Sequence, residues 1–206
     1  AEGKITQGIT TEINGNCGIS AFPMFGETLE RRLPELKNLG LNPWNTCQEY
    51  IDLLKKAKPT INFATLCGHG NLRGSIVGYK DVKTQKRQIN KMKELLKSML
   101  SYDIKGLSTG LIYPPGIFAN TEEIIELAKI LKQFKGIYTT HMRSEGDRVI
   151  GALEETILIA KKAKIPVHIS HLKTSGRDNW WKINAVLKII KEAQNIGIQI
   201  TADRYP

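Results

Sequence analysis

Two histidines at matching places in the chain carry the clearest chemical signal in this sequence. His141 closes the β-branched run 137–141 and His171 closes the run 166–171, and each is followed by a polar loop and a helical pattern. The two residues are 30 positions apart (171 minus 141), about the length of one strand–helix–strand unit of a parallel sheet. Because neighbouring strands lie about 4.8 Å apart, imidazoles at the ends of adjacent strands can share one metal ion.

The alternation of side chains along a strand predicts which way these histidines point. Alternate residues share a face, so His141 should point the same way as Thr139, and His171 the same way as Ile169, both toward a barrel axis. His168 should then point to the opposite face, toward a helix layer, in a structural role. The simpler alternative is that His141 and His171 each only hydrogen-bond a loop, but their equivalent positions on consecutive strands favour metal binding.

Cys17 is the natural third ligand, because it lies in the turn-rich segment 14–20 at the end of a strand-like run. Cysteines are also common as small residues in protein cores, so Cys17 considered alone could be either a metal ligand or a core residue. Together with two histidines it makes a Cys/His/His set, which suits Zn²⁺ with a fourth position open. Zinc in such a site lowers the pKa of water and polarises a carbonyl, which is hydrolytic chemistry. Cys47 and Cys67 are expected in the core.

Strand-like and helix-like segments alternate along the chain, which predicts parallel βαβ units. The candidate polar residues fall where strands end, the rim that carries the active site in (β/α)₈ barrels. A doubly wound sheet also binds ligands there, but the sequence has no glycine-rich phosphate loop. Six strands are fewer than a closed barrel needs, so we expect a smaller open sheet or an incomplete barrel. The predicted strands are 9–14, 60–67, 104–112, 137–141, 166–171 and 198–203. The predicted helices are 28–39, 46–57, 81–100, 149–163 and 181–195. A further helix is predicted to begin near Asn120 or Thr121, either of which can cap it.

Composition limits the other possibilities. The 206 residues are 41% hydrophobic and 24% charged, as in a globular protein, and no apolar run approaches the roughly 18 residues of a membrane span. A net charge of +10 invites a nucleic-acid partner, but the lysines are spread along amphipathic helices without a binding motif. Three irregularly spaced cysteines favour a reducing cytoplasmic location. We expect no signal peptide, because the first residues lead directly into a strand pattern, and one domain over residues 1–206.

Six segments together resemble the N-acyl-D-amino-acid deacylases (D-aminoacylases) of the amidohydrolase superfamily. They run in the family's order across nearly the whole chain, and their combination is highly specific although each alone is weak. The segments are Gly8-Ile9-Thr10-Thr11 with Gly15-Asn16-Cys17-Gly18-Ile19-Ser20, Gly68-His69-Gly70-Asn71-Leu72-Arg73, Gly106 to Gly116, Thr140-His141-Met142-Arg143-Ser144-Glu145, Ile169-Ser170-His171-Leu172-Lys173 and Asp203-Arg204-Tyr205-Pro206.

The resemblance implies a distorted (β/α)₈ barrel that hydrolyses N-acyl-D-amino acids to a carboxylate and a D-amino acid. It implies a tightly bound zinc on Cys17, His141 and His171, the cysteine replacing the carboxylated lysine of many superfamily relatives. Tyr113, Lys173 and Tyr205 match positions that the family uses around the substrate. Physically, Lys173 can pair with a substrate carboxylate and a tyrosine hydroxyl can orient the amide; the alternatives are a solvated charge for Lys173 and loop packing for Tyr113. Two further residues near the rim are candidates for contact with substrate or with the ligands: Arg143 and His69.

The chain also departs from the family pattern. It lacks the His-x-His pair of the first strand, the catalytic aspartate at the end of the eighth strand, and the small β-rich domain built from both termini. Asp203 belongs to the Asp-x-Tyr-Pro segment and does not replace that aspartate. We therefore expect an incomplete (β/α)₈ TIM-type barrel of about strands two to seven, which binds about one zinc, has no catalytic acid or base of its own and shows negligible turnover alone.

Two alternatives remain at this point. One is a different amidohydrolase, either a dihydroorotase-like ring opener or a deacylase of D-glutamate or dipeptides. Another is a non-catalytic metal-binding or basic interaction module. An exposed barrel edge also makes self-association of the chain plausible, because unpaired strand edges recruit other strands.

Overall fold

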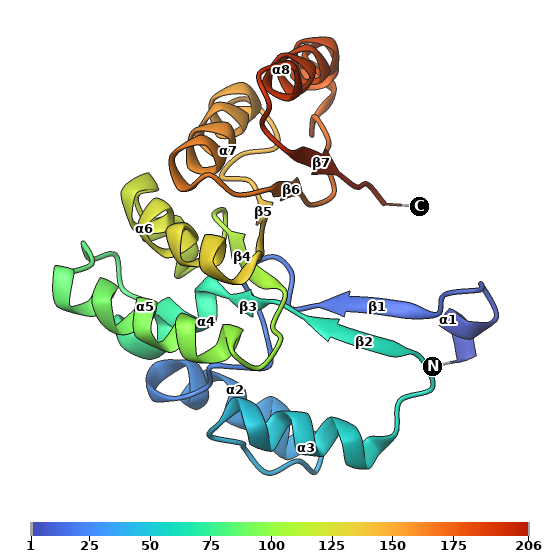
Figure 1. The fold of residues 1–206 in the computed structure, drawn as a ribbon, viewed down its shortest axis with the longest axis vertical. Helices are drawn as coiled ribbons and strands as arrows, with labels where there is room; N and C mark the ends of the chain where they lie inside the picture. Colours follow the sequence, from blue (N-terminus) through green and yellow to red (C-terminus); the bar gives the residue numbers. More distant parts are fainter. Residues whose placement is uncertain (1, 206) are drawn as a thin grey trace.

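The computed structural model describes residues 2–205, and its strands are all parallel and adjacent in chain order. A two-stranded sheet precedes a five-stranded one, and Figure 1 shows the first extending away from the second. Consecutive parallel strands joined by helices are what the alternating sequence pattern predicts. The strands are β1 (Thr11–Asn14), β2 (Asn62–Thr65), β3 (Cys67–Gly68), β4 (Gly106–Gly110), β5 (Ile137–His141), β6 (Val167–Ile169) and β7 (Ile200–Ala202).

The helices that connect the strands form one outer layer. Figure 1 shows α5, α6, α7 and α8 in chain order along one side of the strands, and consecutive members of this series contact each other. Across residues 2–205, no helix has the length and apolar character that crossing a bilayer requires. The α-helices are α1 (Glu2–Ile5), α2 (Gly26–Asn38), α3 (Cys47–Ala57), α4 (His69–Ile76), α5 (Lys86–Leu100), α6 (Thr121–Leu131), α7 (Val149–Ala163) and α8 (Ile183–Asn195), and the 3₁₀ turns are η1 (Gly116–Phe118), η2 (Lys132–Phe134) and η3 (Arg177–Lys182).

The core lies between this helix layer and the five-stranded sheet. Leu107 of β4 and Tyr138 of β5 are fully buried in it, together with Leu127 of α6 and Leu153 of α7. The Tyr138 hydroxyl lies 2.8 Å from Thr109 Oγ1, which satisfies the polar end of this large side chain. The core therefore fixes the strands from one face and leaves the other face and the strand ends available for a site.

Most predicted elements are present, with informative differences. The predicted helix 149–163 is α7 with the same bounds, and Asn120 caps α6 by accepting a hydrogen bond from the Glu123 amide at 2.9 Å. The predicted strand 60–67 is divided into β2 and β3, and the helix predicted over 81–100 begins only at Lys86. Near the N-terminus a short helix, α1, precedes β1, where we expected a strand pattern to follow the opening residues directly.

Helix α4 was not predicted at all. Its sequence, His-Gly-Asn-Leu-Arg-Gly-Ser-Ile, contains two glycines and has low helix propensity. Five of its residues are buried nevertheless, among them His69 and Arg73. Tertiary packing therefore holds this short helix, as it does for most helices that propensity alone cannot sustain.

The strand-face prediction for the second histidine segment is wrong. Val167 and Ile169 belong to the buried core, whereas the ring of His168 faces away from it and lies 2.8 Å from Thr201 Oγ1 and 3.1 Å from Asp203 Oδ2. The strand ends at Ile169, and His171 has a φ of +44°. A left-handed turn, rather than regular alternation, therefore sets the direction of His171.

Candidate metal centre

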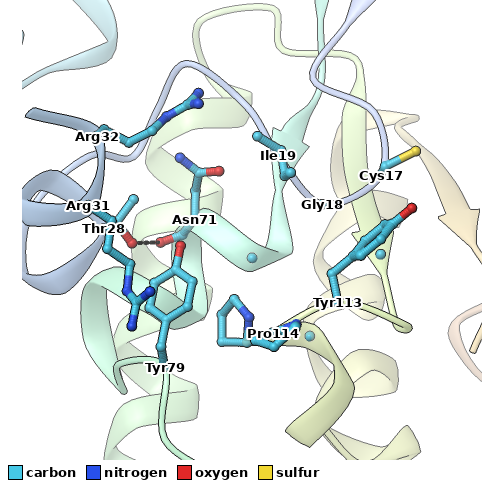
Figure 2. A pocket seen from close by; sticks show the side chains of 14 residues that line it. Cys17, Gly18, Ile19, Thr28, Arg31, Arg32, Asn71, Tyr79, Tyr113 and Pro114 are labelled. Atoms are coloured by element: carbon cyan, nitrogen blue, oxygen red, sulfur yellow. Dashed lines mark hydrogen bonds between the residues drawn. The ribbon is translucent and has the colours of Figure 1, made fainter. Parts of the chain in front are cut away.

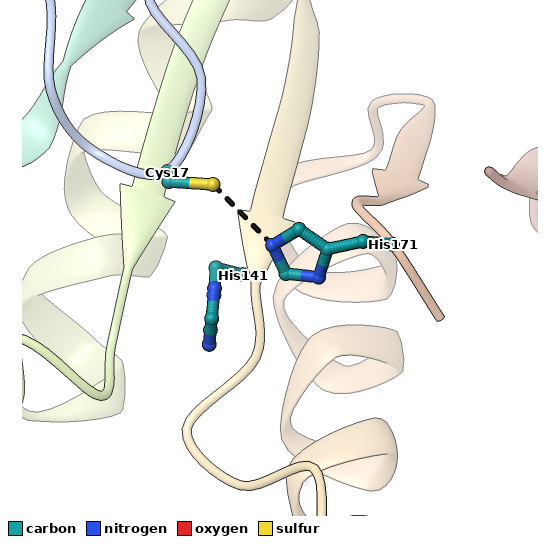
Figure 3. A group of neighbouring side chains, drawn as sticks. All are labelled: Cys17, His141 and His171. Carbon is teal, nitrogen blue, oxygen red and sulfur yellow. Dashed lines mark hydrogen bonds between the residues drawn. The ribbon is translucent and has the colours of Figure 1, made fainter. Parts of the chain in front are cut away.

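Cys17, His141 and His171 converge at the carboxyl ends of the parallel strands. One ligand atom from each lies within 4.8 Å of the others, and Cys17 Sγ is 3.4 Å from His171 Nε2. The two imidazole centroids are 4.3 Å apart in an edge-to-face arrangement. Figure 3 shows the Cys17 thiol pointing toward the His171 ring, with the His141 ring seen edge-on beside them. These three side chains form the one such potential metal-binding group found among residues 2–205.

The loop that carries Cys17 rests directly on β4. Cys17 and Gly18 both have positive φ, and Ser108 Oγ accepts the Gly18 amide at 3.1 Å while donating to the carbonyl of Gly15. A Cβ atom at Gly110 would lie 2.2 Å from the carbonyl oxygen of Cys17. Only glycine at position 110 permits this close approach, so backbone contact between the loop and β4 determines where the thiol lies.

His141 ends β5, and its ring is buried beside Tyr113. The Tyr113 hydroxyl is 3.4 Å from Nδ1, and Nε2 has no hydrogen-bond partner among the residues that the structure describes. Burial lowers the pKa of His141 to about 4, nearby Glu145 opposes the shift, and electrostatic interactions with Lys173 and the His171 ring add to it. The imidazole is therefore neutral near pH 7, with a lone pair available to a metal ion.

His171 is held by its backbone and by its second ring nitrogen. Its amide donates to the carboxylate of Asp203, and Lys173 Nζ donates to its carbonyl at 2.9 Å. Its Nδ1 lies 2.9 Å from Glu145 Oε1 and 3.0 Å from Lys173 Nζ, and its Nε2 faces Cys17 Sγ at 3.4 Å. A carboxylate on the remote nitrogen is the usual way in which proteins orient a metal-binding histidine.

Glu145 also belongs to this centre. It is part of the segment 140–145 in the sequence comparison with the family, but no role was predicted for it. Its Oε1 is 2.5 Å from Lys173 Nζ and 3.5 Å from His141 Nε2, in addition to its contact with His171. The only available signal was an acidic residue four positions after His141. Burial and the charge of Glu145 raise the pKa of the Cys17 thiol, with Lys173 opposing them and Asp203 adding to them. A bound cation would stabilise the thiolate instead.

Three of the five predicted substrate residues lie beside this group. Tyr113 packs edge-on against His141 with ring centroids 4.8 Å apart, and Tyr205 stacks on His171 at 5.5 Å. Lys173 Nζ lies 4.9 Å from the centre of the Tyr205 ring. Pro206, the last residue of the quoted Asp203–Pro206 segment, lies outside the described residues.

The other two predicted residues are occupied elsewhere. His69 is 0% exposed and lies in α4, where its Nε2 is 2.9 Å from Glu123. The Arg143 guanidinium is bound by Glu155 and by two backbone carbonyls. In this structure neither side chain faces the space between Cys17, His141 and His171.

A cavity of about 180 Å³ adjoins the centre behind the Cys17 loop. Figure 2 shows Asn71 and Tyr79 on its walls and the Cys17 sulfur pointing away from them, so the cavity touches the backbone side of that loop. Its lining residues are Cys17, Gly18, Ile19, Thr28, Arg31, Arg32, Gly70, Asn71, Tyr79, Gly110, Tyr113, Pro114, Pro115 and Gly116.

Comparison with known proteins identifies relatives along the whole chain. No protein-family model matches it. A D-aminoacylase from Alcaligenes xylosoxydans xylosoxydans is 36% identical over 203 residues, which cover 98% of this chain and 42% of the relative. A D-aminoacylase crystal structure, described as defining a subset of amidohydrolases, superimposes with a TM-score of 0.88 at 34% identity, over 98% of this chain and 43% of that one.

A third comparison adds a structure solved with ligands. N-acyl-D-glutamate deacylase from Bordetella bronchiseptica, complexed with zinc and a phosphonate inhibitor that mimics the tetrahedral intermediate, superimposes with a TM-score of 0.89 at 33% identity, again over 98% of this chain and 43% of that one. The expected α/β fold, part of an amidohydrolase TIM-type barrel, is thereby confirmed. The chain spans about 42% of the length of its curated relatives, and it belongs to the D-aminoacylase family of N-acyl-D-amino-acid deacylases.

Proposed function

We propose that this chain supplies the zinc centre of a deacylase that hydrolyses the amide bond of N-acyl-D-amino acids to a carboxylate and a free D-amino acid. The observation that carries the proposal is the convergence of Cys17, His141 and His171 within 4.8 Å. Relatives over the whole chain support it, one of them a deacylase complexed with zinc.

The donor set fits a zinc ion in size as well as in chemistry. With bonds of about 2.3 Å to sulfur and 2.0–2.1 Å to nitrogen, tetrahedral ligands stand roughly 3.3–3.6 Å apart. The 3.4 Å between Cys17 Sγ and His171 Nε2 already has this value. The buried Nε2 of His141, which lacks a hydrogen-bond partner within residues 2–205, fits the third ligand position. When bound, zinc supplies Lewis-acid polarisation of the amide carbonyl and activation of water.

The surrounding residues of the chain bind and orient the substrate in this proposal. The ammonium group of Lys173, which contacts Glu145 at 2.5 Å here, exchanges one of its contacts for the carboxylate of the D-amino acid. The Tyr113 hydroxyl donates to the amide oxygen. Tyr205 covers His171 and limits access of water to that side. The group that moves the proton to the leaving nitrogen is the aspartate expected outside this chain.

Lys173→Met in the complete protein is expected to raise KM for N-acetyl-D-methionine about tenfold to 100-fold, because a charge-assisted hydrogen bond contributes about 1.5–3 kcal/mol. The change in kcat should be smaller, since the contact with the carboxylate exists before and during the reaction. Lys188→Met is the matched control, because Lys188 is 76% exposed on α8 and 3.9 Å from Glu192. An unchanged KM for the Lys173 variant contradicts the assigned role.

Gly110→Ala is expected to weaken zinc binding about tenfold to 100-fold, the loss typical of disturbing the groups that position ligands. The added Cβ would lie 2.2 Å from the Cys17 carbonyl oxygen, so the Cys17 loop must move. Gly151→Ala is the control, because a Cβ there would meet no heavy atom of the described residues within 4 Å apart from those of its chain neighbours and its own helix backbone. Competition with a colorimetric chelator measures both affinities, and equal values for the two variants would count against the positioning argument.

The proposed activity is tested with a substrate panel on the complete protein. Hydrolysis of N-acetyl-D-methionine with rejection of its L-enantiomer supports it, whereas hydrolysis confined to N-acetyl-D-glutamate identifies the deacylase of D-glutamate among the alternatives. Turnover of dihydroorotate or of a dipeptide instead would identify the protein as a different amidohydrolase, a dihydroorotase-like enzyme or a dipeptide deacylase. Full zinc loading with no turnover of any of these compounds leaves a metal-binding module.

We further propose a cytoplasmic location, supported by Cys17, Cys47 and Cys67, which are free cysteines in the part of the chain that the structure describes. A small-molecule substrate remains the proposed partner, with no nucleic acid or membrane partner expected.

Self-association along β1 is a further proposal, supported by Ile13, whose exposed fraction is 54%. That residues 1–206 make one partial-barrel domain stays a prediction.

A further inference from the structure

The guanidinium of Arg143 lies at the junction of three elements near the metal centre. Arg143 follows His141 by two residues, and its Nε and Nη2 donate to the two carboxylate oxygens of Glu155 on α7 at 2.9 and 3.0 Å. Its Nη1 donates to the carbonyl of Ile117 at 3.1 Å, and Nη2 donates to that of Ala119 at 2.9 Å. With the guanidinium occupied in this way, Arg143 has no free fork with which to hold a substrate carboxylate.

The two carbonyls belong to the loop that carries Tyr113. This loop leaves β4 beside β5, where the Leu111 amide donates to the carbonyl of His141 at 3.1 Å. It then turns back, with the Ile117 amide donating to the carbonyl of Tyr113 at 2.8 Å. The Tyr113 residue is 44% exposed, so its position depends on the backbone of the loop more than on packing around the ring.

We propose that Arg143 is a positioning residue: together with Glu155 it fixes the Tyr113 loop relative to β5, and thereby holds the Tyr113 hydroxyl beside His141. The effect of Arg143 on kcat rests on the proposed function, whereas its effect on the position of the loop does not. Arginine suits this place because its planar fork binds a carboxylate with two bonds and still has donors for carbonyls, which a lysine ammonium cannot reproduce. The Arg143 and Glu155 side chains are only 28% and 12% exposed, so solvent screens the pair less than a surface ion pair.

The first test is hydrogen exchange in the complete protein, which needs no catalytic activity. In Arg143→Ala, the amides of Ile117 and Ala119 should exchange about tenfold faster or more, because local opening of the loop becomes easier. Arg143→Lys and Glu155→Gln should show smaller increases. Lys93→Ala is the matched control, since Lys93 is also 28% exposed and forms a 2.8 Å ion pair, with Glu126, on other helices.

The second test is a double-mutant cycle with Tyr113→Phe. Arg143→Ala should lower kcat about tenfold to 100-fold through misplacement of the tyrosine, with zinc content unchanged and a much smaller change in KM. In the Tyr113→Phe background, Arg143→Ala should lower kcat by less than about threefold, because the effects of substitutions at coupled residues are not additive. Arg143→Lys should recover part of kcat.

The outcomes separate this inference from the proposed function. Unchanged exchange of the loop amides in Arg143→Ala, Arg143→Lys and Glu155→Gln overturns the positioning role, whatever the enzyme hydrolyses. If Arg143→Ala lowers kcat by the same factor in the wild-type protein and in the Tyr113→Phe variant, Arg143 does not act through the tyrosine. If the complete protein hydrolyses no N-acyl-D-amino acid, the proposed function fails, and the exchange experiment still decides whether Arg143 fixes the loop.

Discussion

Replacing Cys17 with alanine in the complete protein is expected to lower zinc affinity by far more than about 100-fold, the upper range for changing a residue that only supports a ligand. The substitution removes the one thiolate from the group and leaves two imidazoles, 4.3 Å apart by ring centroid, to hold the ion. Deacylation should fall to background, because the Lewis acid is lost with the ion. Elemental analysis of the dialysed protein and a progress curve with N-acetyl-D-methionine measure the two effects.

Cys47→Ala is the matched control for this experiment. Cys47 is 7% exposed in the core on α3 and contributes no atom to the metal-binding group. The control should lose some stability through a small cavity but keep one equivalent of zinc. A Cys17→Ala variant that retains a full equivalent of zinc after dialysis contradicts the ligand assignment.

The second large effect concerns Glu123, which is 2% exposed and lies away from the metal centre. Its carboxylate is 2.9 Å from His69 Nε2, 2.6 Å from Thr84 Oγ1 and 3.5 Å from Arg73 Nε. Glu123→Ala leaves the guanidinium of Arg73 buried without its carboxylate, so the free energy of unfolding should drop by about 3–5 kcal/mol. Urea unfolding followed by tryptophan fluorescence measures the change.

Glu122→Ala is the control, because Glu122 is the exposed neighbour of Glu123 in the first turn of α6. Its loss removes only a favourable interaction with the helix dipole, about 0.3–1 kcal/mol. Similar losses of stability in the two variants would show that the buried cluster is not a major source of stability.

The same carboxylate predicts how stability depends on pH. Burial by itself raises the pKa of Glu123, but hydrogen bonds from His69 and Thr84 and the charges of His69 and Arg73 outweigh it and hold the pKa below 4.5. A depressed folded-state pKa contributes stability that is present above pH 4.5 and is lost as the pH falls through the folded-state value. The stability difference between wild type and Glu123→Gln should therefore be constant above that pH and shrink below it. A difference that persists unchanged in stronger acid contradicts the low pKa.

The sequence could predict the parts of the site that strand ends determine. His141 closes a regular strand, so its position followed from the run 137–141 and from the parallel βαβ pattern. Cys17 and His171 were also predicted to lie near it, and in the structure the three lie together, while their role as zinc ligands stays a prediction. For His171 the reason given was wrong, because a left-handed turn and the Asp203 carboxylate, not strand alternation, direct its ring.

The remaining features depend on contacts between segments that are distant in the sequence. His69 was expected at the rim, but residues 69–76 form α4 and bury its ring against Glu123, 54 positions away. Arg143 was expected near the substrate, but carbonyls 24 and 26 positions earlier occupy its guanidinium. Neither contact produces a local periodicity or spacing, so inspection of one sequence could not have found them.

X-ray absorption at the zinc edge of the complete, reconstituted protein tests the central claim most directly. The account predicts one sulfur at about 2.3 Å and imidazole nitrogens at about 2.0–2.1 Å around the metal ion, with the sulfur contribution absent from whatever zinc Cys17→Ala retains. A stoichiometric zinc ion whose coordination shell contains no sulfur in the wild-type protein would contradict it.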